Sequence, residues 1–205
     1  SECASVVSLN TPQYDRIGSV GKPLPHLEVS CDNGEVCITG NPFLGYVGDP
    51  ASWQPQCIAS GDLGDLDGDG YLHLQGRKKN LLITSFGRNI SPEWVESELT
   101  AAPLVQDVVV VGDGRSWLTA LLYPRSAGVS DGELDAWVQT VNASLPDYAR
   151  IGRWLRLAKP LSSYDGLTTA TGKPKRDAIY RHFQTAIEQL YDDRCAEVSL
   201  PCTIQ

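Results

Sequence analysis

The stretch Gly76-Arg77-Lys78-Lys79-Asn80-Leu81-Leu82-Ile83-Thr84 separates two parts of this sequence that differ in pattern. The residues before it are rich in glycine and proline, with short runs in which apolar and polar side chains alternate. The residues after it place apolar side chains at helical spacing between short apolar runs. We therefore predict an α+β protein of two compact parts, residues 1–77 and 78–205, joined by a short basic hinge.

The first part is expected to be β-rich. Residues 27–31 and 35–39 alternate in strand fashion around Asp32-Asn33-Gly34, and Asn-Gly between two such runs is a strong hairpin signal. Two further strands are expected at 71–74 and 81–84. Short strands joined by tight turns favour an open sheet or a small, distorted barrel.

The second part is expected to be a compact α/β domain with a short antiparallel sheet and flanking helices. Ser91-Pro92-Glu93 predicts a helix start, with an N-cap serine, a proline in the first turn and an acid near the positive helix end. Strands are expected at 108–111, 117–123 and 154–157. Two further helices are predicted by the spacing of Leu134, Trp137, Val138 and Val141, and of Ile179, Phe183, Ile187 and Leu190.

Composition and charge exclude several classes of function. A net charge of -8 over 205 residues opposes non-specific nucleic-acid binding, which needs cations to neutralise phosphates. No apolar run approaches the ~20 residues of a membrane helix, and no signal peptide opens the chain. The six cysteines form no zinc-type cluster, so we expect reduced thiols in a cytoplasmic protein, with Cys31 and Cys37 placed to face each other across the hairpin. The absence of methionine indicates a fragment of a longer protein.

Three segments carry candidate chemistry, and the first is Ser60-Gly61-Asp62 with the acidic run that follows it. Its simplest interpretation is a pair of turns between strands, since Asp and Gly are turn residues. Asp65, Asp67, Asp69 and Gly70 also occupy positions 1, 3, 5 and 6 of a calcium loop. Position 12 of such a loop should be a bidentate glutamate and is Gly76 here, so the turns are favoured.

The second and third segments are basic. Residues 76–80 lead into 85–93, which reads as a solvated basic turn before a helix cap or as a site for a phosphorylated or ribose-bearing ligand. Residues 169–176 read Thr-Ala-Thr-Gly-Lys-Pro-Lys-Arg. Charge alone favours an exposed loop there.

In their order and spacing these segments resemble the late motifs of the AMP-forming acyl-acid ligases, the superfamily of acyl-CoA synthetases, luciferases and peptide-synthetase adenylation domains. Residues 18–25 (Gly-Ser-Val-Gly-Lys-Pro-Leu-Pro) and Gly45-Tyr46 are similar to further family segments. The runs 76–85 and 167–176 look most like the long-chain acyl-CoA synthetase branch. Ser1-Glu2 resembles the end of a Tyr-Gly-x-Ser/Thr-Glu motif, which implies that a preceding adenylating domain, with the phosphate loop and acyl pocket, is missing.

The resemblance implies a two-step reaction. A carboxylate attacks the α-phosphate of ATP to give an acyl-adenylate and pyrophosphate, with Mg²⁺ bound, and a thiol then displaces AMP. The thiol belongs to coenzyme A or to a carrier protein. The small C-terminal domain rotates between the two steps, so residues 1–77 would end the large domain and 78–205 would form a mobile lid.

Roles in the first part follow residue by residue from the same resemblance. Asp62 would accept hydrogen bonds from the ribose hydroxyls, which suits an ionised carboxylate. Arg77 would support the ribose or the domain junction. Lys79 would be the hinge, because the backbone there must absorb the rotation. Glu2 would be the acid on the magnesium side.

In the lid, Lys173 would act in adenylation alone, where its ammonium can bridge the attacking carboxylate and the α-phosphate. Gly87 would line the path of the thiol, since glycine lets a slim pantetheine arm pass close to backbone. Phe86 stands where close relatives often have Gly or Ser, which leaves the thiol acceptor open.

The favoured interpretation is therefore the C-terminal fragment of an ATP-dependent ligase that acts on a carboxylic, and by resemblance fatty, acid. The isolated chain is expected to be inactive. The alternative is a lid-like binding or regulatory module that pairs with a separate large subunit. The identity of the acid and the oligomeric state stay open, because the acid-selecting residues would precede Ser1.

Overall fold

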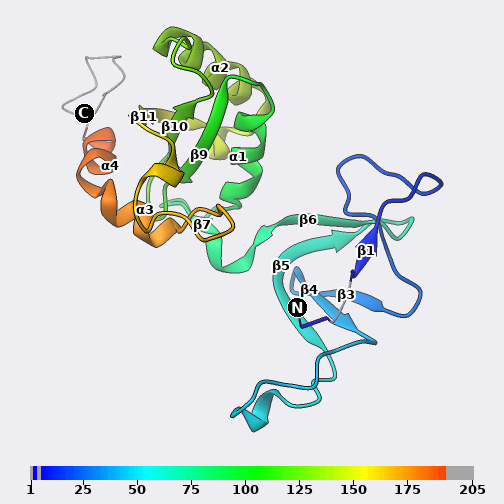
Figure 1. Ribbon diagram of the computed structural model, residues 1–205. Helices are drawn as coiled ribbons and strands as arrows, with labels where there is room; N and C mark the ends of the chain where they lie inside the picture. The colour runs from blue at the N-terminus through cyan, green and yellow to red at the C-terminus, as the bar shows by residue number, and fades with distance from the viewer. Residues whose placement is uncertain (1, 4–5, 193–205) are drawn as a thin grey trace. The chain divides into compact units, whose positions relative to one another are not determined.

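A computed structural model describes residues 2–3 and 6–192, which form two compact units (Figure 1). The chain divides between Asn80 and Leu81, and we call the parts unit 1 and unit 2. Unit 1 consists of strands and short 3₁₀ turns, whereas unit 2 combines a sheet with four α-helices. The predicted α+β class is confirmed.

Unit 1 contains a four-stranded antiparallel sheet in the order β3-β4-β5-β6. The strands are β3 (Glu28–Asp32), β4 (Glu35–Thr39), β5 (Ile58–Leu66) and β6 (Leu72–Arg77). Asp32 pairs with Glu35 across a two-residue turn in which Asn33 and Gly34 have φ values of 49° and 81°. Positive φ at both central positions is the geometry of a type I′ hairpin, so the predicted Asn-Gly hairpin is present.

The sheet of unit 1 stays open, and the expectation of a distorted barrel is corrected. Strands β3 and β6 are its two edges. The remaining strands of this unit, β1 (Ser8–Leu9) and β2 (Lys22–Pro23), pair with each other. The residues just before β2 contact the β6 edge, where Val20 N donates to Leu72 O and Leu72 N donates to Gly21 O, both at 2.9 Å. Among the described residues no strand pairing joins β3 to β6, so the sheet does not close into a barrel. A small core of Leu27, Val36, Ile38 and Leu72 covers one face.

Strand β5 corrects a second expectation, because Ser60–Leu66 lies within this strand instead of forming turns. The glycines serve close strand packing: a Cβ on Gly64 would lie 2.4 Å from the carbonyl oxygen of His73 on β6. Only the Asp67–Gly70 segment turns, with Gly70 N donating to Asp67 O at 2.9 Å.

Unit 2 is built on a three-stranded sheet in the order β11-β10-β9. The strands are β9 (Val105–Val111), β10 (Leu118–Pro124) and β11 (Ile151–Arg156). Strands β9 and β10 are antiparallel, as expected, but β11 is parallel to β10. The reason is the crossover through helix α2 (Asp131–Ser144), which returns the chain to the end where β10 began.

Helices cover both faces of this sheet, so unit 2 has two cores. Helices α1 (Pro92–Thr100) and α2 pack against Leu118, Ala120 and Leu122. Helices α3 (Arg176–His182) and α4 (Gln184–Tyr191) pack against Leu121 and Leu155. The sequence predicts one helix over 179–190, but the structure breaks it at Phe183, whose φ and ψ are -101° and 14°.

Three smaller findings complete the fold. A hairpin of β7 (Leu82–Ile83) and β8 (Asn89–Ile90) precedes α1. Cys31 pairs with Val36 and not with Cys37, so these thiols do not face each other; Cys195 and Cys202 lie outside the described residues. Over the part of the chain that the structure describes, no helix is long and apolar enough to span a bilayer.

Candidate functional site

Asp62 and Arg77 meet at the end of the β5–β6 ladder, where they are cross-strand partners. Arg77 Nε lies 2.7 Å from Asp62 Oδ1, and Arg77 Nη1 donates to Ser60 O at 3.1 Å. The Asp62 side chain is 27% exposed, and its Oδ2 has no protein partner among the described residues. A carboxylate held by a guanidinium on one side and open on the other can accept hydrogen bonds from ligand hydroxyls.

Glu35 was given no role from the sequence, although it joins the Ser60-Gly61-Asp62 segment to the basic turn. Its Oε1 accepts from Gly61 N at 3.1 Å, and its Oε2 lies 2.8 Å from Lys78 Nζ. The hydrogen bond from Lys78 is the main reason that the pKa of Glu35 is lowered. The Asn-Gly hairpin places Glu35 beside β5, but its partners are 26 and 43 residues away.

The predicted hinge residue, Lys79, lies in a short 3₁₀ turn, η2 (Lys78–Asn80), directly after β6. Its side chain is exposed and makes no hydrogen bond or ion pair with any residue that the structure describes. Lys78, in contrast, is tied to Glu35. The backbone at Lys79 is therefore held by its preceding neighbour and not by its own side chain.

Gly87 belongs to the turn that connects β7 and β8. Its φ is 74°, and its N–H donates to Thr84 O at 2.9 Å. The buried Thr84 hydroxyl accepts from Arg88 N at 3.1 Å, which fixes the base of the turn. Phe86 stands at the tip with 74% of its surface exposed.

Lys173 projects from a narrow loop, Leu167–Lys175, which we call the lysine loop. Lys175 N donates to Leu167 O at 2.8 Å, and Thr169 N donates to Lys173 O at 2.9 Å. Thr169 Oγ1 also accepts from Lys173 N at 3.0 Å. The Lys173 side chain is exposed and has no partner within residues 2–3 and 6–192, so the loop presents an unpaired ammonium to solvent.

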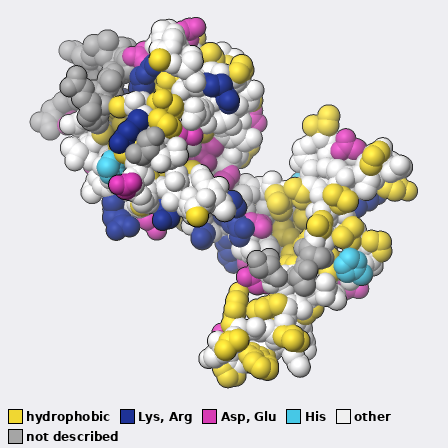
Figure 2. Space-filling model, viewed as in Figure 1, with side chains coloured by type: hydrophobic (Ala, Val, Ile, Leu, Met, Phe, Trp, Pro, Cys, Tyr) yellow, Lys and Arg dark blue, Asp and Glu magenta, His cyan; other side chains and the backbone are white. Residues whose placement is uncertain are grey.

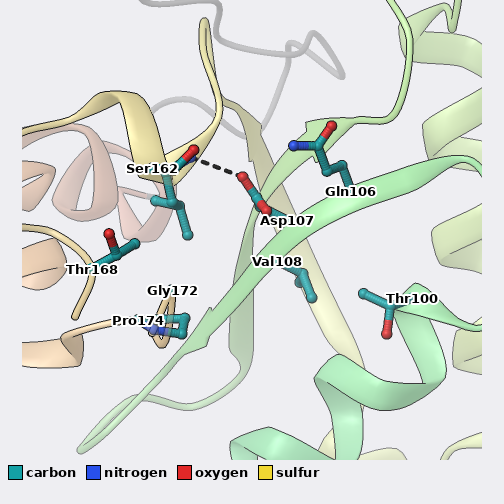
Figure 3. A pocket seen from close by; sticks show the side chains of 9 residues that line it. Thr100, Gln106, Asp107, Val108, Ser162, Thr168, Gly172 and Pro174 are labelled. Carbon is teal, nitrogen blue, oxygen red and sulfur yellow. Dashed lines mark hydrogen bonds between the residues drawn. The ribbon is translucent and has the colours of Figure 1, made fainter. Parts of the chain in front are cut away.

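A cavity of about 220 Å³ lies beside the lysine loop (Figure 3). Thr168, Gly172 and Pro174 line one side, and Gln106, Asp107 and Val108 of β9 line the other, with Thr100 at the end of α1. Asp107 Oδ2 accepts from Leu161 N at 2.8 Å, which closes one wall. The loop is therefore not packed along its whole length against the sheet.

Glu2 is the one residue assigned to a metal. Its Oε1 accepts from Tyr46 Oη at 2.8 Å, and this hydroxyl is the main cause of its lowered pKa. Magnesium is often held by one or two carboxylates together with substrate phosphates, which a single glutamate fits. The described residues offer no cluster of three or more metal-binding side chains.

The calcium interpretation of the acidic run is not supported by its geometry. Asp67 and Asp69 both pair with Arg16, the latter at 2.6 Å, and Asp67 Oδ1 accepts from the backbone of Asp69 and Tyr71 at 3.0 Å. His73 Nε2 lies 3.0 Å from Asp67 Oδ2. Through Arg16, these carboxylates connect the 10–21 loop to the β5–β6 turn.

The candidate residues thus fall into two sets. Asp62, Arg77, Lys79 and Glu2 belong to unit 1, whereas Gly87 and Lys173 belong to unit 2. Within unit 1, Asp62 and Arg77 are in direct contact.

Comparison with known proteins identifies the family. A model described as the AMP-binding enzyme C-terminal domain matches residues 79–195. The long-chain-fatty-acid–CoA ligase FadD15 of Mycobacterium bovis is 30% identical over 221 residues, covering 94% of this chain and 37% of the relative. The putative fatty-acid–CoA ligase fadD11 of Mycobacterium tuberculosis is 32% identical over 220 residues, covering 93% and 38%. The chain thus spans little more than a third of these relatives.

Solved structures agree. The o-succinylbenzoate coenzyme A synthetase MenE of Bacillus subtilis in complex with AMP matches with a TM-score of 0.70 and 28% identity, over 86% of this chain and 38% of that one. The anthranilate CoA ligase AuaEII in complex with anthranoyl-AMP matches with a TM-score of 0.75 over 91% and 39%, and at 24% identity it supports the fold alone. Because the family model covers more than half of the sequence, this chain belongs to the AMP-binding enzyme C-terminal domain family of the AMP-forming acyl-acid ligases.

Proposed function

We propose that this chain is the C-terminal part of an ATP-dependent ligase that joins a fatty acid to a thiol such as that of coenzyme A. The observation that carries the proposal is the unpaired Lys173 ammonium at the end of a hydrogen-bonded loop in a family whose structures hold AMP and acyl-adenylates. The fatty-acid assignment draws on FadD15 and fadD11, whose names specify such substrates.

In the first step, an oxygen of the acid would bond to the α-phosphorus of ATP, and pyrophosphate would leave. Negative charge builds on the α-phosphate oxygens as the carboxylate approaches. The Lys173 ammonium is the group suited to neutralise that charge, since it is a compact cation with three donors and no partner of its own among the described residues. Losing such a contact typically costs about 3 kcal/mol, or roughly a hundredfold in rate.

Asp62 and Arg77 would hold the nucleotide in both steps. The open oxygen of Asp62 would accept hydrogen bonds from ribose hydroxyls, while Arg77 Nε, 2.7 Å from the other carboxylate oxygen, would orient the side chain. Glu2 would be the single protein carboxylate that this chain offers to the magnesium–phosphate complex, and the ion supplies charge neutralisation when bound.

In the second step, the thiol sulfur would attack the acyl carbonyl carbon, lose its proton, and release AMP. Gly87 would line the approach of the thiol, where a side chain would narrow the passage. Lys79 would absorb the rotation between the two steps, since η2 lies at the boundary of the two units and the Lys79 side chain anchors nothing. Residues 1–77 would then end the large domain, and residues 78–205 would form the mobile lid.

The isolated chain is expected to lack activity. Unit 1 exposes large apolar side chains, including Ile17, Leu44 and Val47, which are 98%, 78% and 102% exposed (Figure 2). So many large apolar side chains at full exposure usually mark a surface that meets another protein surface. We infer that a preceding adenylating domain, for which the remaining length of the relatives leaves room, covers it.

Lys173→Ala in the full-length protein tests this function. Acyl-adenylate formation should fall about a hundredfold or more, while thioester formation from supplied acyl-adenylate should change less than about threefold. Pyrophosphate exchange measures the first step, and thioester release measures the second. Equal loss of both steps would refute the division of roles.

A further inference from the structure

Arg176 follows Lys173 by three residues and begins helix α3, where its guanidinium lies against carboxylates of helix α1. Nη1 and Nη2 donate to Glu96 Oε1 and Oε2 at 2.8 and 2.7 Å, which is a bidentate pair. Nη2 also lies 3.4 Å from Glu93 Oε1. The Arg176 and Glu96 side chains are only 20% and 14% exposed, so solvent screens this pair weakly.

The same two side chains also hold the sheet. Glu96 Oε1 accepts from Val110 N at 2.8 Å, and Arg176 Nη1 lies 3.4 Å from Val110 O. Burial raises the pKa of the Glu96 carboxyl, and the hydrogen bonds from Arg176 oppose that shift. Arg176 thus joins α1, β9 and α3 at one point, which we call the arginine clamp (Arg176, Glu96, Glu93 and Val110).

The lysine loop has little other support on this side. The 220 Å³ cavity lies beside Thr168, Gly172 and Pro174, so packing does not fix that part of the loop (Figure 3). The cavity is next to the clamp, because Thr100 lies one turn beyond Glu96 on α1 and Val108 lies two residues before Val110 on β9. Lys175, the other loop cation, is exposed and has no partner in the described part of the chain.

We propose that Arg176 is a positioning residue for adenylation: the arginine clamp fixes the stem of the lysine loop, so that unit 2 presents the Lys173 ammonium in one place. The proposal rests on the role of Lys173 in the proposed function. Arg176 itself is turned toward α1 and β9, so it would act through the loop and not on the reacting atoms. An error of about 1 Å in placing a catalytic group can cost roughly a hundredfold in rate.

Amide hydrogen exchange on the chain tests the anchoring without any activity. Arg176→Met should speed amide exchange of residues 167–175 by about tenfold or more. In this variant the lysine loop can open without breaking the contacts of the arginine clamp. Two matched controls should change it by less than about threefold. Lys175→Met removes a loop cation that anchors nothing, and Arg156→Met removes a similarly buried ion pair, 2.7 Å from Asp131 with an 18% exposed arginine, elsewhere in unit 2. Equal acceleration in all three variants would overturn the proposal.

Half-reactions in the full-length protein test the consequence. Arg176→Met should lower kcat for adenylation by about 10- to 100-fold with little change in KM, while thiol transfer from supplied acyl-adenylate stays within about threefold. Arg176→Lys keeps the charge but not the bidentate geometry, so it should recover part of the loss. If Arg176→Met does not fold, the ratio of the two half-reactions in Arg176→Lys decides, and an unchanged ratio would overturn the proposal.

Lys173→Ala separates the two levels of inference. If it abolishes adenylation and folded Arg176→Met spares adenylation, the clamp proposal fails alone. If Lys173→Ala itself spares adenylation, the proposed role of Lys173 fails, and the positioning role falls with it whatever the exchange data show.

Discussion

Units 1 and 2 differ in how their sheets are covered and in how much apolar surface they bury. Unit 2 covers both faces of its sheet with helices, and Leu118, Ala120, Leu121 and Leu122 of β10 are fully buried. Among its described residues, unit 1 has only a four-residue buried cluster on its sheet and leaves Ile17, Leu44, Val47 and Trp53 largely exposed. The difference indicates that unit 2 has a core of its own, whereas unit 1 has little, which fits the proposal that unit 1 continues into a larger domain.

Separating the units should give the largest effect. Residues 81–192 expressed alone should melt in one cooperative transition, because both cores lie within them. Residues 1–80 alone should show no cooperative transition, because a small one-sided sheet buries too little apolar surface. Circular dichroism melts of the two pieces measure this, and a cooperative melt of residues 1–80 would break the comparison.

Core truncations should rank the two units in the full-length protein, in which we propose that a further domain supports unit 1. Leu121 is 0% exposed and lies in the core between the sheet and helices α3 and α4. Leu121→Ala should therefore lower the free energy of unfolding of unit 2 by about 3–4 kcal/mol. Leu72→Ala, in the small core of unit 1, should lower the free energy of unfolding by about 2 kcal/mol. The cost is smaller because few side chains surround Leu72, and they can move to fill part of the space that it leaves. Urea melts followed by probes in each unit report both values, and the reverse ranking would contradict the account.

Acid should weaken unit 1 through Glu35. Its folded pKa lies below the ordinary value of 4.5, so its stabilising contribution is present above that pH and is lost as the pH falls through the folded pKa. Glu35→Gln should therefore make the stability of unit 1 less dependent on pH below pH 4.5. An unchanged pH profile in the variant would show that the Lys78–Glu35 pair contributes nothing measurable.

Polar replacement of the exposed apolar residues should give the smallest effect. Val47→Ser changes a fully exposed side chain and should shift the stability of the isolated chain by less than about 0.5 kcal/mol. In the full-length protein the same change should cost more if a domain covers this surface. Thermal melts of both forms make the test, and equal shifts would argue against that cover.

Local signals in the sequence predicted local structure well. Asn33-Gly34 and Ser91-Pro92-Glu93 identify the β3–β4 hairpin and the start of α1, because turn and helix-start signals act within a few residues. The Ser91 hydroxyl makes no capping hydrogen bond and donates to Glu93 Oε2 at 3.1 Å instead. Strand β5 escaped prediction, because Gly61 and Gly64 are poor strand formers and only their contact with β6 explains them.

Contacts between residues far apart in the chain could not be predicted from the sequence. The parallel pairing of β11 depends on where the α2 crossover lands. The arginine clamp joins residues 80 positions apart, and nothing near Arg176 in the sequence marks Glu96 as its partner. Family resemblance suggested Asp62, Arg77 and Lys173 as site residues, but it carried no information on what holds each of them in place.

The measurement that tests the account most directly compares the two units in one assay. Asp62→Ala in unit 1 and Lys173→Ala in unit 2 are each assayed for both half-reactions in the full-length protein. The account predicts that Asp62→Ala slows both steps by similar factors, since the ribose is held throughout, whereas Lys173→Ala slows adenylation by about a hundredfold and spares thiol transfer. If Lys173→Ala slowed both steps by similar factors, as Asp62→Ala is expected to do, the result would contradict a role of Lys173 in adenylation alone.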